Sequence, residues 1–256
     1  MRVAVGGSTG QVGRLLNQAL RNAGHDVVGL SRAVGFDLAD TGVVNVLAER
    51  LADVDAVVDV TNVITQDRAE SASFFSAVAE NIGKAATAAG VSRTVLLSIV
   101  GVDGIPNDAH YAAKYLQEQT HREYAPGVHI VRAAQFHEFS EMVLEWGRDR
   151  DRTTVPDFPV RPVHLDVVVS ALLEAAAGTP VSTMLDVAGP RPERLADMVT
   201  RLVRARGERL EVLAVPASPE LNAGACIPGA DALIAGPSFD EWLEGKYGIR
   251  VDPPRR

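Results

Sequence analysis

Short apolar runs alternate with amphipathic stretches along the first half of the chain. Runs such as these are typical of strands buried in a parallel sheet, and apolar residues three and four apart mark one face of a helix. After the first run, Val12, Leu15, Leu16 and Leu20 follow the helical spacing, and Gly24 is a suitable helix end. The predicted strands are 3–5, 26–30, 56–60, 93–98 and 128–132, and the predicted helices are 11–23, 43–51, 74–89 and 110–124.

This alternation, with short connections, predicts parallel strands with helices on both faces. We therefore expect an α/β protein with a Rossmann-type, doubly wound parallel sheet and a small, interleaved C-terminal substrate lobe. The expected domains are residues 1–136 and 137–256, with a strand near 183–188 that returns to the sheet. The second part is predicted to contain helices at 137–147, 165–177, 193–206 and 239–247, a strand at 211–215, and a proline-rich stretch between the first two helices.

Composition limits the function classes. Hydrophobic residues make up 46% of the 256 residues, which suffices for a sizeable core, and the longest apolar runs are too short for a membrane span. The net charge of −8 argues against direct binding to nucleic acid or an anionic membrane. The single cysteine, Cys226, excludes an internal disulfide, and His137, His164 and Asp166 lack metal-ligand spacing. The N-terminus has no signal-peptide pattern, so we expect a cytoplasmic protein whose partner is a small-molecule acceptor.

Ligands of such sheets bind beyond the carboxyl ends of the strands, and the first strand is followed by a glycine loop. The loop reads Gly-Gly-Ser-Thr-Gly-Gln-Val-Gly, with spaced glycines at Gly7, Gly10 and Gly13. Glycines allow a tight turn and a close approach of backbone to a pyrophosphate, and the next helix offers its free N–H groups to the phosphates. Because the loop joins a first strand to a first helix, it predicts a bound dinucleotide.

The end of the second strand predicts which dinucleotide binds. An NAD-specific site has an acidic residue there, which bonds the ribose 2′-hydroxyl. Here the strand ends at Leu30 and is followed by Ser31 and Arg32. A guanidinium suits a 2′-phosphate, so NADP(H) is favoured over NAD, unless Arg32 is only a solvated loop residue.

Several segments together resemble the short-chain dehydrogenase/reductase superfamily, and more narrowly its atypical, NmrA-like NAD(P)-binding members. The glycine loop resembles that of the family, and Phe36-Asp37-Leu38 resembles its adenine-contacting pair. The segments 98–103, 132–139 and 239–243 resemble later parts of the reductase-like branch. The resemblance implies cofactor contacts from Gly7, Ser8, Thr9, Gly10, Gln11, Val12, Ser31, Arg32, Asp37, Thr61, Asn62, Ser98 and Lys114, and a substrate pocket near Gln135, Phe136 and His137.

The predicted catalytic helix departs from the family pattern. Reductases of the family use Tyr-x-x-x-Lys, in which the lysine holds the nicotinamide ribose and the tyrosine exchanges a proton with the substrate. Lys114 fits, but His110 stands four residues before it, and Tyr111 is one residue late. Successive helical residues are rotated by about 100°, so Tyr111 is not expected at the usual place of the hydroxyl.

Three interpretations stay open for this helix. His110 acts as the proton donor, Tyr111 acts from a shifted backbone, or neither acts and the cofactor is bound without turnover. The first two predict an NADPH-dependent oxidoreductase that reduces a small carbonyl or quinone-type acceptor. The third predicts a redox-sensing regulatory or binding module of the NmrA-like kind. A relative of sugar-nucleotide epimerases is a further possibility, against which the altered tyrosine position also counts.

Overall fold

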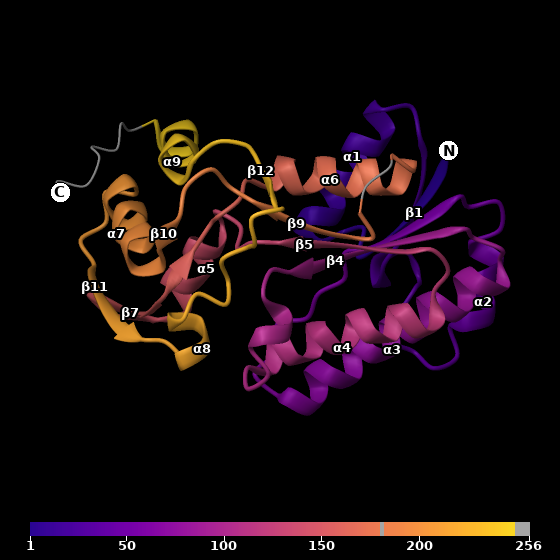
Figure 1. Ribbon diagram of the computed structural model, residues 1–256, viewed down its shortest axis with the longest axis horizontal. Coiled ribbons are helices and arrows are strands. Elements are labelled where there is room, and N and C mark those ends of the chain that lie inside the picture. Colours follow the sequence, from indigo (N-terminus) through magenta and orange to yellow (C-terminus); the bar gives the residue numbers. More distant parts are fainter. Residues whose placement is uncertain (180–181, 249–256) are drawn as a thin grey trace. The chain divides into compact units, whose positions relative to one another are not determined.

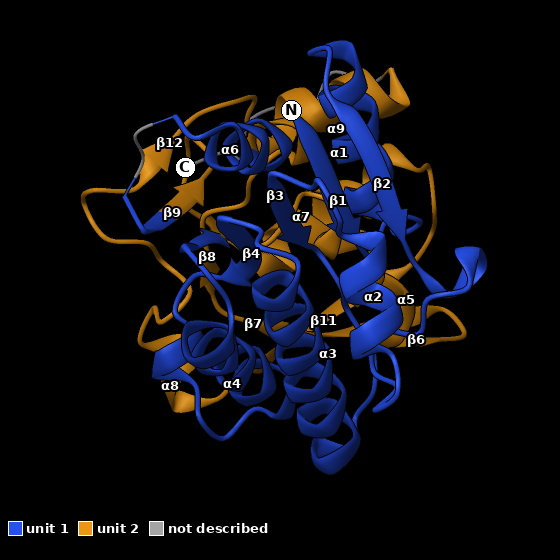
Figure 2. Cartoon of the chain, turned by 90° about the vertical axis from the view of Figure 1, so that its right-hand side faces the viewer, with its two compact units in different colours: residues 1–132, 168–185 blue, residues 133–167, 186–256 orange. Residues whose placement is uncertain are grey.

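The chain forms two compact units (Figure 2). The structure is a computed structural model that describes residues 1–179 and 182–248. Unit 1 consists of Met1–Arg132 and Val168–Leu185, and unit 2 consists of Ala133–Val167 and Asp186–Arg256. The chain therefore returns once to unit 1 before it ends in unit 2. This division differs from the expected boundary after residue 136, because residues 168–185, which contain most of one helix and the start of one sheet strand, belong to unit 1. That 1–136 and 137–256 are functional domains stays a prediction.

The largest sheet has seven strands, which are β1 (Arg2–Gly6), β2 (Asp26–Leu30), β3 (Ala56–Asp59), β4 (Arg93–Ile99), β5 (Val128–Ala133), β9 (Met184–Ala188) and β12 (Leu233–Ile234). Their order is β12-β9-β5-β4-β3-β1-β2, and Figure 1 labels β12, β9, β5, β4 and β1 of this sheet. β1 pairs in parallel with β2 on one side and with β3 on the other, and β3 pairs in parallel with β4. The strand order therefore reverses at β1, and the crevice beyond the carboxyl ends of β1 and β3 is where such sheets bind ligands.

Helices cover both faces of this sheet. α1 (Gln11–Asn22) lies on one face, and α2 (Val44–Arg50), α3 (Arg68–Ala88) and α4 (Ala109–Tyr124) lie on the other, with α3 and α4 side by side (Figure 1). α6 (Leu165–Ala177) lies on the same face as α1 (Figure 1). The predicted Rossmann-type α/β fold with a doubly wound parallel sheet is confirmed.

Apolar residues of β1, β2 and β3 pack with those of α2 and α3 in one buried cluster of unit 1. Ala4 of β1 and Val57 of β3 are fully buried in the same cluster as Leu47 of α2 and Ile82 of α3. A strand that is covered on both faces cannot alternate between polar and apolar residues, which explains the continuous apolar runs.

The third helix begins earlier than its apolar pattern predicts. α3 starts at Arg68 rather than near residue 74, because Asp67 accepts hydrogen bonds from the backbone N–H groups of Ala69 and Glu70 and thereby caps the helix. The first turns of α3 are polar and exposed, so hydrophobic periodicity alone does not reveal them.

Unit 2 contains two small sheets and four helices within its described residues. β11 (Glu211–Pro216) and β6 (Arg148–Asp149) flank β7 (Arg152–Asp157), and β8 (Pro159–Val160) pairs with β10 (Glu193–Arg194). β7 and β8 occupy the proline-rich stretch, for which the sequence predicts no strand. The helices of this unit are α5 (Phe139–Trp146), α7 (Leu195–Ala205), α8 (Pro219–Asn222) and α9 (Phe239–Tyr247).

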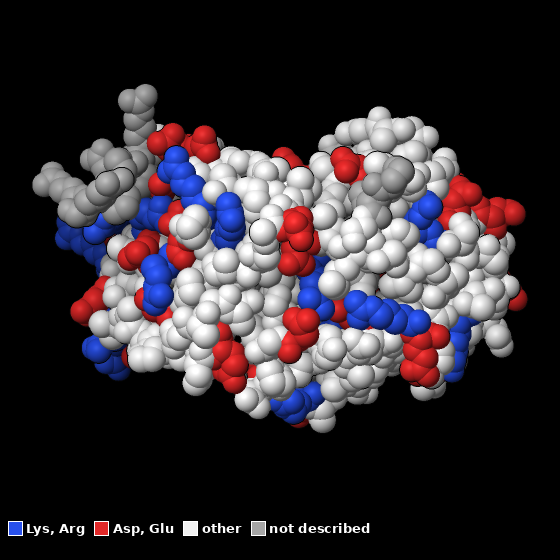
Figure 3. Space-filling model, viewed as in Figure 1, with Lys and Arg blue, Asp and Glu red and all other residues white. Residues whose placement is uncertain are grey.

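Acidic and basic side chains are interspersed on the face that Figure 3 shows, without a continuous basic area. Across residues 1–179 and 182–248, no group of three or more His, Cys, Asp or Glu side chains is arranged to hold a metal ion. None of the helices in these ranges combines the length and hydropathy needed to span a membrane.

Candidate dinucleotide site

The glycine loop turns tightly between β1 and α1. Gly7 has φ +78, and its N–H donates to the carbonyl oxygen of Leu30 at 3.0 Å. A Cβ atom on Gly13 would lie 2.2 Å from the carbonyl oxygen of Gly7, so the start of α1 packs directly on the loop. Ser8 is buried against Gly29 of β2, whereas Thr9 and Gly10 are exposed. The loop thus has the two properties for which glycine was expected, a positive φ and a close backbone approach.

The N-terminus of α1 has no cap from a side chain. Its N-cap is Gly10, and the first turn of the helix contains no acidic residue. The first N–H groups of a helix have no partner within the helix, so those of Gln11 and Val12 point out of the N-terminus of α1. A phosphate group suits this end of a helix because of its donors and its positive dipole end.

The end of β2 places a buried hydroxyl beside an exposed guanidinium. Ser31 is buried, and within the described residues its Oγ atom has no hydrogen-bond partner. Arg32 follows as an exposed residue at the start of a short 3₁₀ turn. Asp37 is exposed, and its Oδ1 atom accepts a hydrogen bond from the N–H of Ala39.

The residues after β3 and β4 differ in exposure. Thr61 is buried, and both its N–H and its hydroxyl donate to Asp59 Oδ1, at 2.9 Å and 2.7 Å. Asn62 is exposed. Ser98, near the end of β4, is buried, and within the described residues its Oγ atom lacks a hydrogen-bond partner. Unpaired buried hydroxyls are unusual in proteins and are consistent with a ligand that supplies the missing partner.

Lys114 is a buried lysine on α4. Its ammonium donates to the carbonyl oxygen of Leu97 at 2.7 Å and to Gln117 Oε1 at 2.6 Å, and it lies 5.0 Å from the centre of the Phe75 ring. Burial lowers the pKa of Lys114 to about 8, although the charges of Asp59 and Glu118 oppose the shift. The lysine is therefore held firmly and is mostly protonated near pH 7.

His110 and Tyr111 lie in the first turn of a regular helix. Asp108 caps α4 by accepting hydrogen bonds from the N–H groups of both residues, at 2.8 Å and 3.1 Å. The backbone of α4 is helical from Ala109 onward, so its start is not displaced toward the family spacing. Burial and the charge of Lys114 lower the pKa of His110 to about 4, and the imidazole is neutral near pH 7.

The three residues expected to line the substrate pocket all lie in unit 2. Gln135 and His137 are buried, and Phe136 is half-buried. The ring of His137 lies 5.7 Å from those of Phe239 and Trp242, and its Nε2 atom lies 3.2 Å from the carbonyl oxygen of Pro237. Burial lowers the pKa of His137 to about 4. Their contact with an acceptor stays a prediction.

The sequence analysis does not predict a buried polar cluster that lies between β3 and α4 of unit 1. It consists of Asp59, Gln117 and His121, which are fully buried. The only sequence signal is a charged residue inside the apolar run 56–60. The partners of Asp59 are far away along the chain, 58 residues for Gln117 and 62 for His121, so no local pattern connects them.

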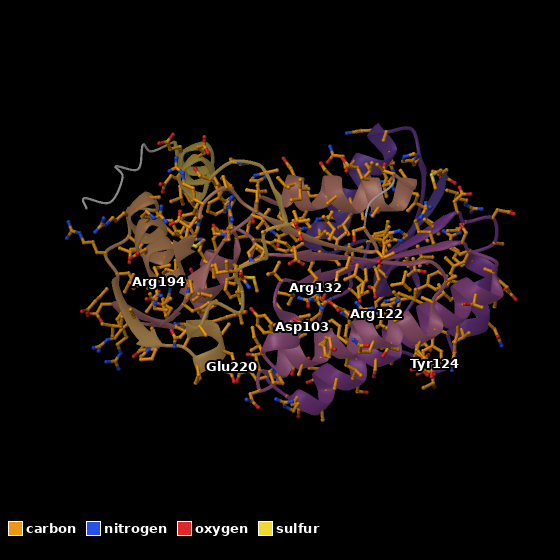
Figure 4. The ribbon with its side chains drawn as sticks, viewed as in Figure 1. Asp103, Arg122, Tyr124, Arg132, Arg194 and Glu220 are labelled. Atoms are coloured by element: carbon orange, nitrogen blue, oxygen red, sulfur yellow. The ribbon has the colours of Figure 1, made fainter. Side chains whose placement is uncertain are left out.

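A buried ion pair lies between α4 and β5. Arg132 donates from Nε and Nη2 to the two carboxylate oxygens of Glu118, both at 2.8 Å. Its Nη1 atom donates to Asp103 at 3.3 Å, and Arg132 and Asp103 are labelled in Figure 4. Glu118 is fully buried, and its hydrogen bonds and charge raise the pKa of Arg132. A planar guanidinium that meets both oxygens of one carboxylate fixes the helix to the strand.

Taken together, these residues of unit 1 fit a dinucleotide. Residues 7–13, 31–32 and 61–62 directly follow or begin at the carboxyl ends of β1, β2 and β3, which are neighbours in the sheet. They provide the glycine turn, the free helix N-terminus and, at Ser31, an unpaired hydroxyl, which suit a pyrophosphate and a ribose.

Comparison with known proteins identifies the family of the chain and solved structures that share its fold. No curated protein matches the chain in sequence. Residues 3–134 of the 256 match the model of the NAD dependent epimerase/dehydratase family, which is more than half of the chain. The narrower NmrA-like resemblance is not confirmed by this match.

Solved structures with this fold include enzymes of different activities. A dTDP-4-dehydrorhamnose reductase from Bacillus anthracis in complex with NADP is 17% identical, with TM-score 0.71 over 98% of this chain and 99% of that one. An NADPH-dependent quinone oxidoreductase from Escherichia coli, complexed with NADPH, is 15% identical, with TM-score 0.71 over 95% and 99%. A UDP-glucuronic acid 4-epimerase from Bacillus cereus, in complex with UDP-glucuronic acid and NAD, is 16% identical, with TM-score 0.71 over 97% and 98%. Identities this low establish a shared fold and no shared reaction. On the strength of the family match and the glycine loop it contains, the chain belongs to the NAD-dependent epimerase/dehydratase family.

Proposed function

We propose that this protein binds NADP(H) in unit 1 and reduces a small carbonyl or quinone-type acceptor. The observation that carries the proposal is the end of β2, where Ser31 and Arg32 follow the strand and no acidic residue is present. A carboxylate there would bond a 2′-hydroxyl and repel a 2′-phosphate, whereas a guanidinium attracts the phosphate. Two of the three solved structures described above contain NADP or NADPH, which supports a nicotinamide dinucleotide of this kind.

Different residues of unit 1 would contact different parts of the cofactor. The N–H groups at the start of α1 would bind the pyrophosphate, Asp37 the adenine side, and Lys114 the nicotinamide ribose. When bound, NADPH supplies the hydride, and with one proton it converts a carbonyl to an alcohol and becomes NADP⁺. The protein has to provide that proton or a path for it.

Tyr111 is the better proton donor of the two candidates on α4. With a pKa of about 4, His110 is neutral near pH 7, and a neutral imidazole gives up its remaining proton far less readily than a phenol does. Because the start of α4 is not displaced, Tyr111 would act from a position one residue later than in the family pattern; it is three residues before Lys114, on the same broad face of the helix. The ammonium of Lys114 would favour the phenolate that forms when the proton leaves.

Cofactor preference provides the first test. We expect Arg32→Asp to weaken NADPH binding by about 10- to 100-fold, since one or two charge-assisted hydrogen bonds to phosphate are lost, and to change NADH binding by less than about 3-fold. Titration of nicotinamide fluorescence with each cofactor measures both values. Arg21→Asp makes the same charge change at the far end of α1 and is the matched control. Equal weakening of both cofactors in Arg32→Asp would contradict the 2′-phosphate role.

Turnover provides the second test. We expect the protein to oxidise NADPH in the presence of a panel of aldehydes and quinones, which the absorbance of the reduced nicotinamide records. Tyr111→Phe is expected to lower kcat by about 100-fold or more, and His110→Phe by less. Tyr115→Phe, at an exposed position of the same helix, is the control. If both Tyr111→Phe and His110→Phe keep full activity, neither residue donates the proton; a rate that rises as pH falls toward 4 points to His110 instead.

A second candidate function follows from the same helix. The low pKa of His110 and the altered position of the tyrosine favour a redox-sensing module that binds NADP(H) without turnover. Tight binding of NADPH by the wild-type protein, with no oxidation by any acceptor of the panel, would favour this module over the reductase.

A further inference from the structure

A single carboxylate lies at the centre of the polar cluster in unit 1. Asp59 is the last residue of β3 and is fully buried. Its Oδ1 atom accepts two hydrogen bonds from Thr61, and its Oδ2 atom accepts one from Gln117 Nε2 at 2.8 Å and lies 2.9 Å from His121 Nε2. Burial raises the pKa of Asp59, but His121, Lys114 and Thr61 together lower it below its usual value. The carboxylate is therefore ionised and acts only as an acceptor.

The charge of Asp59 fixes the orientation of the neighbouring amide. An ionised carboxylate has no proton to donate, so Gln117 has to turn its NH₂ group toward Asp59 and its Oε1 atom away from it. That Oε1 atom accepts the hydrogen bond from the ammonium of Lys114 at 2.6 Å. If the amide were reversed, two donors would face each other at Lys114. Asp59 on one side and the ammonium of Lys114 on the other therefore require the same orientation of Gln117, and the amide links the two charges in one hydrogen-bond chain.

We propose that Asp59 is a positioning residue for two of the proposed cofactor contacts. One of its carboxylate oxygens holds Thr61, and the other holds Lys114 through the side chain of Gln117. The two positioned residues are cofactor contacts only if the proposed function holds, and to that extent the inference rests on it. The hydrogen-bond chain itself is independent of any ligand, so it can be tested separately.

The surroundings of Lys114 show which groups influence its ammonium. The Phe75 ring faces it from α3, and the carbonyl oxygen of Leu97 faces it from β4. The nearby charged groups are Asp59 on β3 and Glu118 on α4, and the titratable imidazole of His110 is also on α4. Loss of the Asp59 charge and reversal of the Gln117 amide would both disfavour the protonated lysine.

Lysine NMR provides a direct test without cofactor. The chain contains three lysines, Lys84, Lys114 and Lys246, so a sample with ¹³C-labelled lysine gives few side-chain signals, and Lys114→Arg assigns the relevant one. In Asp59→Asn, we expect the titration midpoint of Lys114 to fall by about one pH unit relative to wild type, since a nearby opposite charge is worth about one to three units. The signals of Lys84 and Lys246 are internal references and are expected not to move.

A double variant that exchanges the carboxylate of residue 59 and the amide of residue 117 extends the test. In the double variant Asp59→Asn, Gln117→Glu, the amide at position 59 donates to the carboxylate at 117, which again accepts from Lys114. We expect its Lys114 midpoint to return to the wild-type value or above it, because the net charge is kept and the donor–acceptor order is restored. The carboxylate at 117 also raises the midpoint by its own charge, so this variant tests only whether a restored acceptor at 117 holds the ammonium, and Gln117→Met tests the link to Asp59.

Two further variants complete the test. Gln117→Met keeps Asp59 with Thr61 and His121 and removes only the link to Lys114, so its Lys114 midpoint is expected to fall; it decides the question if Asp59→Asn does not fold. Glu123→Gln, an exposed charge change on α4, is expected to have no effect. An unchanged Lys114 midpoint in both Asp59→Asn and Gln117→Met would overturn the proposal. NADPH affinity is measured in parallel: if the midpoints move as expected but wild type binds no NADPH, the proposed function fails while the positioning role stands.

Discussion

Replacement of Gly13 by alanine is expected to destabilise the protein by about 3 kcal/mol or more and to abolish measurable NADPH binding. A Cβ atom at this position would lie 2.2 Å from the carbonyl oxygen of Gly7 and 2.9 Å from the Cα atom of Ser8. Both neighbours are backbone atoms, so no rotation of a side chain can relieve the clash. The start of α1 would have to move away from the loop, and the N–H groups that are proposed to bind the pyrophosphate would move with it. Urea denaturation followed by circular dichroism gives the stability, and nicotinamide fluorescence gives the affinity.

Alanine substitutions of two other glycines are controls that distinguish the effect of steric overlap from the effect of replacing a glycine. A Cβ atom on Gly10 would have one contact, 3.2 Å from the carbonyl oxygen of Gly7, and one on Gly229 would have no atom within 4 Å. We expect Gly10→Ala to cost less than about 1 kcal/mol and Gly229→Ala to have no measurable effect on stability or affinity. A stable Gly13→Ala protein that binds NADPH like wild type would contradict the close packing of α1 on the loop.

The strands of unit 1 could be predicted because the burial of each strand is visible in its own short stretch of sequence. A strand covered by helices on both faces is an uninterrupted apolar run, as at 3–5, and its neighbours are separated by short amphipathic helices. The sequence does not predict β7, because Pro156 lies in it, Pro159 and Pro162 follow it, and proline is rare inside sheets. Its pairing with β11, about 60 residues later, depends on tertiary contacts that no local pattern reveals.

The site could be predicted only where its residues lie together in the sequence. The glycine loop and the Ser31–Arg32 pair are local motifs, and the structure gives them the turn and the exposure that the motifs imply. The Asp59 cluster joins β3 to α4, and none of its residues belongs to a local sequence motif that would single it out. Recognition of such a cluster requires knowledge of the sheet order and of the helix face that covers it.

The fold does not decide the reaction of this family member. The same architecture occurs in a reductase, a quinone oxidoreductase and an epimerase, all at low identity to this chain. The residues that differ from the family pattern, His110 and Tyr111, are therefore more informative about activity than the sheet that positions them. For this reason, single replacements on α4 distinguish the reductase from the binding module better than any further comparison of folds.

Loss of either partner of the Arg132–Glu118 pair is expected to destabilise the protein by about 3–5 kcal/mol, while loss of both costs less than loss of either one. Glu118 is fully buried and receives both of its 2.8 Å hydrogen bonds from Arg132, so Arg132→Met leaves a buried carboxylate whose remaining cation, Arg122, is exposed at 3.5 Å. In Glu118→Leu, Arg132 keeps only Asp103, which is itself largely exposed. The double variant replaces the buried charges by apolar groups of similar length and removes the unpaired charge.

A double-mutant cycle measures this coupling, with unfolding free energies from urea denaturation of the four proteins. We expect a coupling energy above about 2 kcal/mol for Arg132 and Glu118, because each single variant leaves a charge in a place that water does not reach. The exposed pair of Lys84 and Glu80 on α3 is the control, and its cycle is expected to give about 0.5 kcal/mol or less, since solvent screens both charges. Additive effects in the Arg132–Glu118 cycle would mean that β5 and α4 are held together by their apolar contacts alone. A large coupling would instead show that this ion pair fixes α4, and therefore His110, Tyr111 and Lys114, against the sheet.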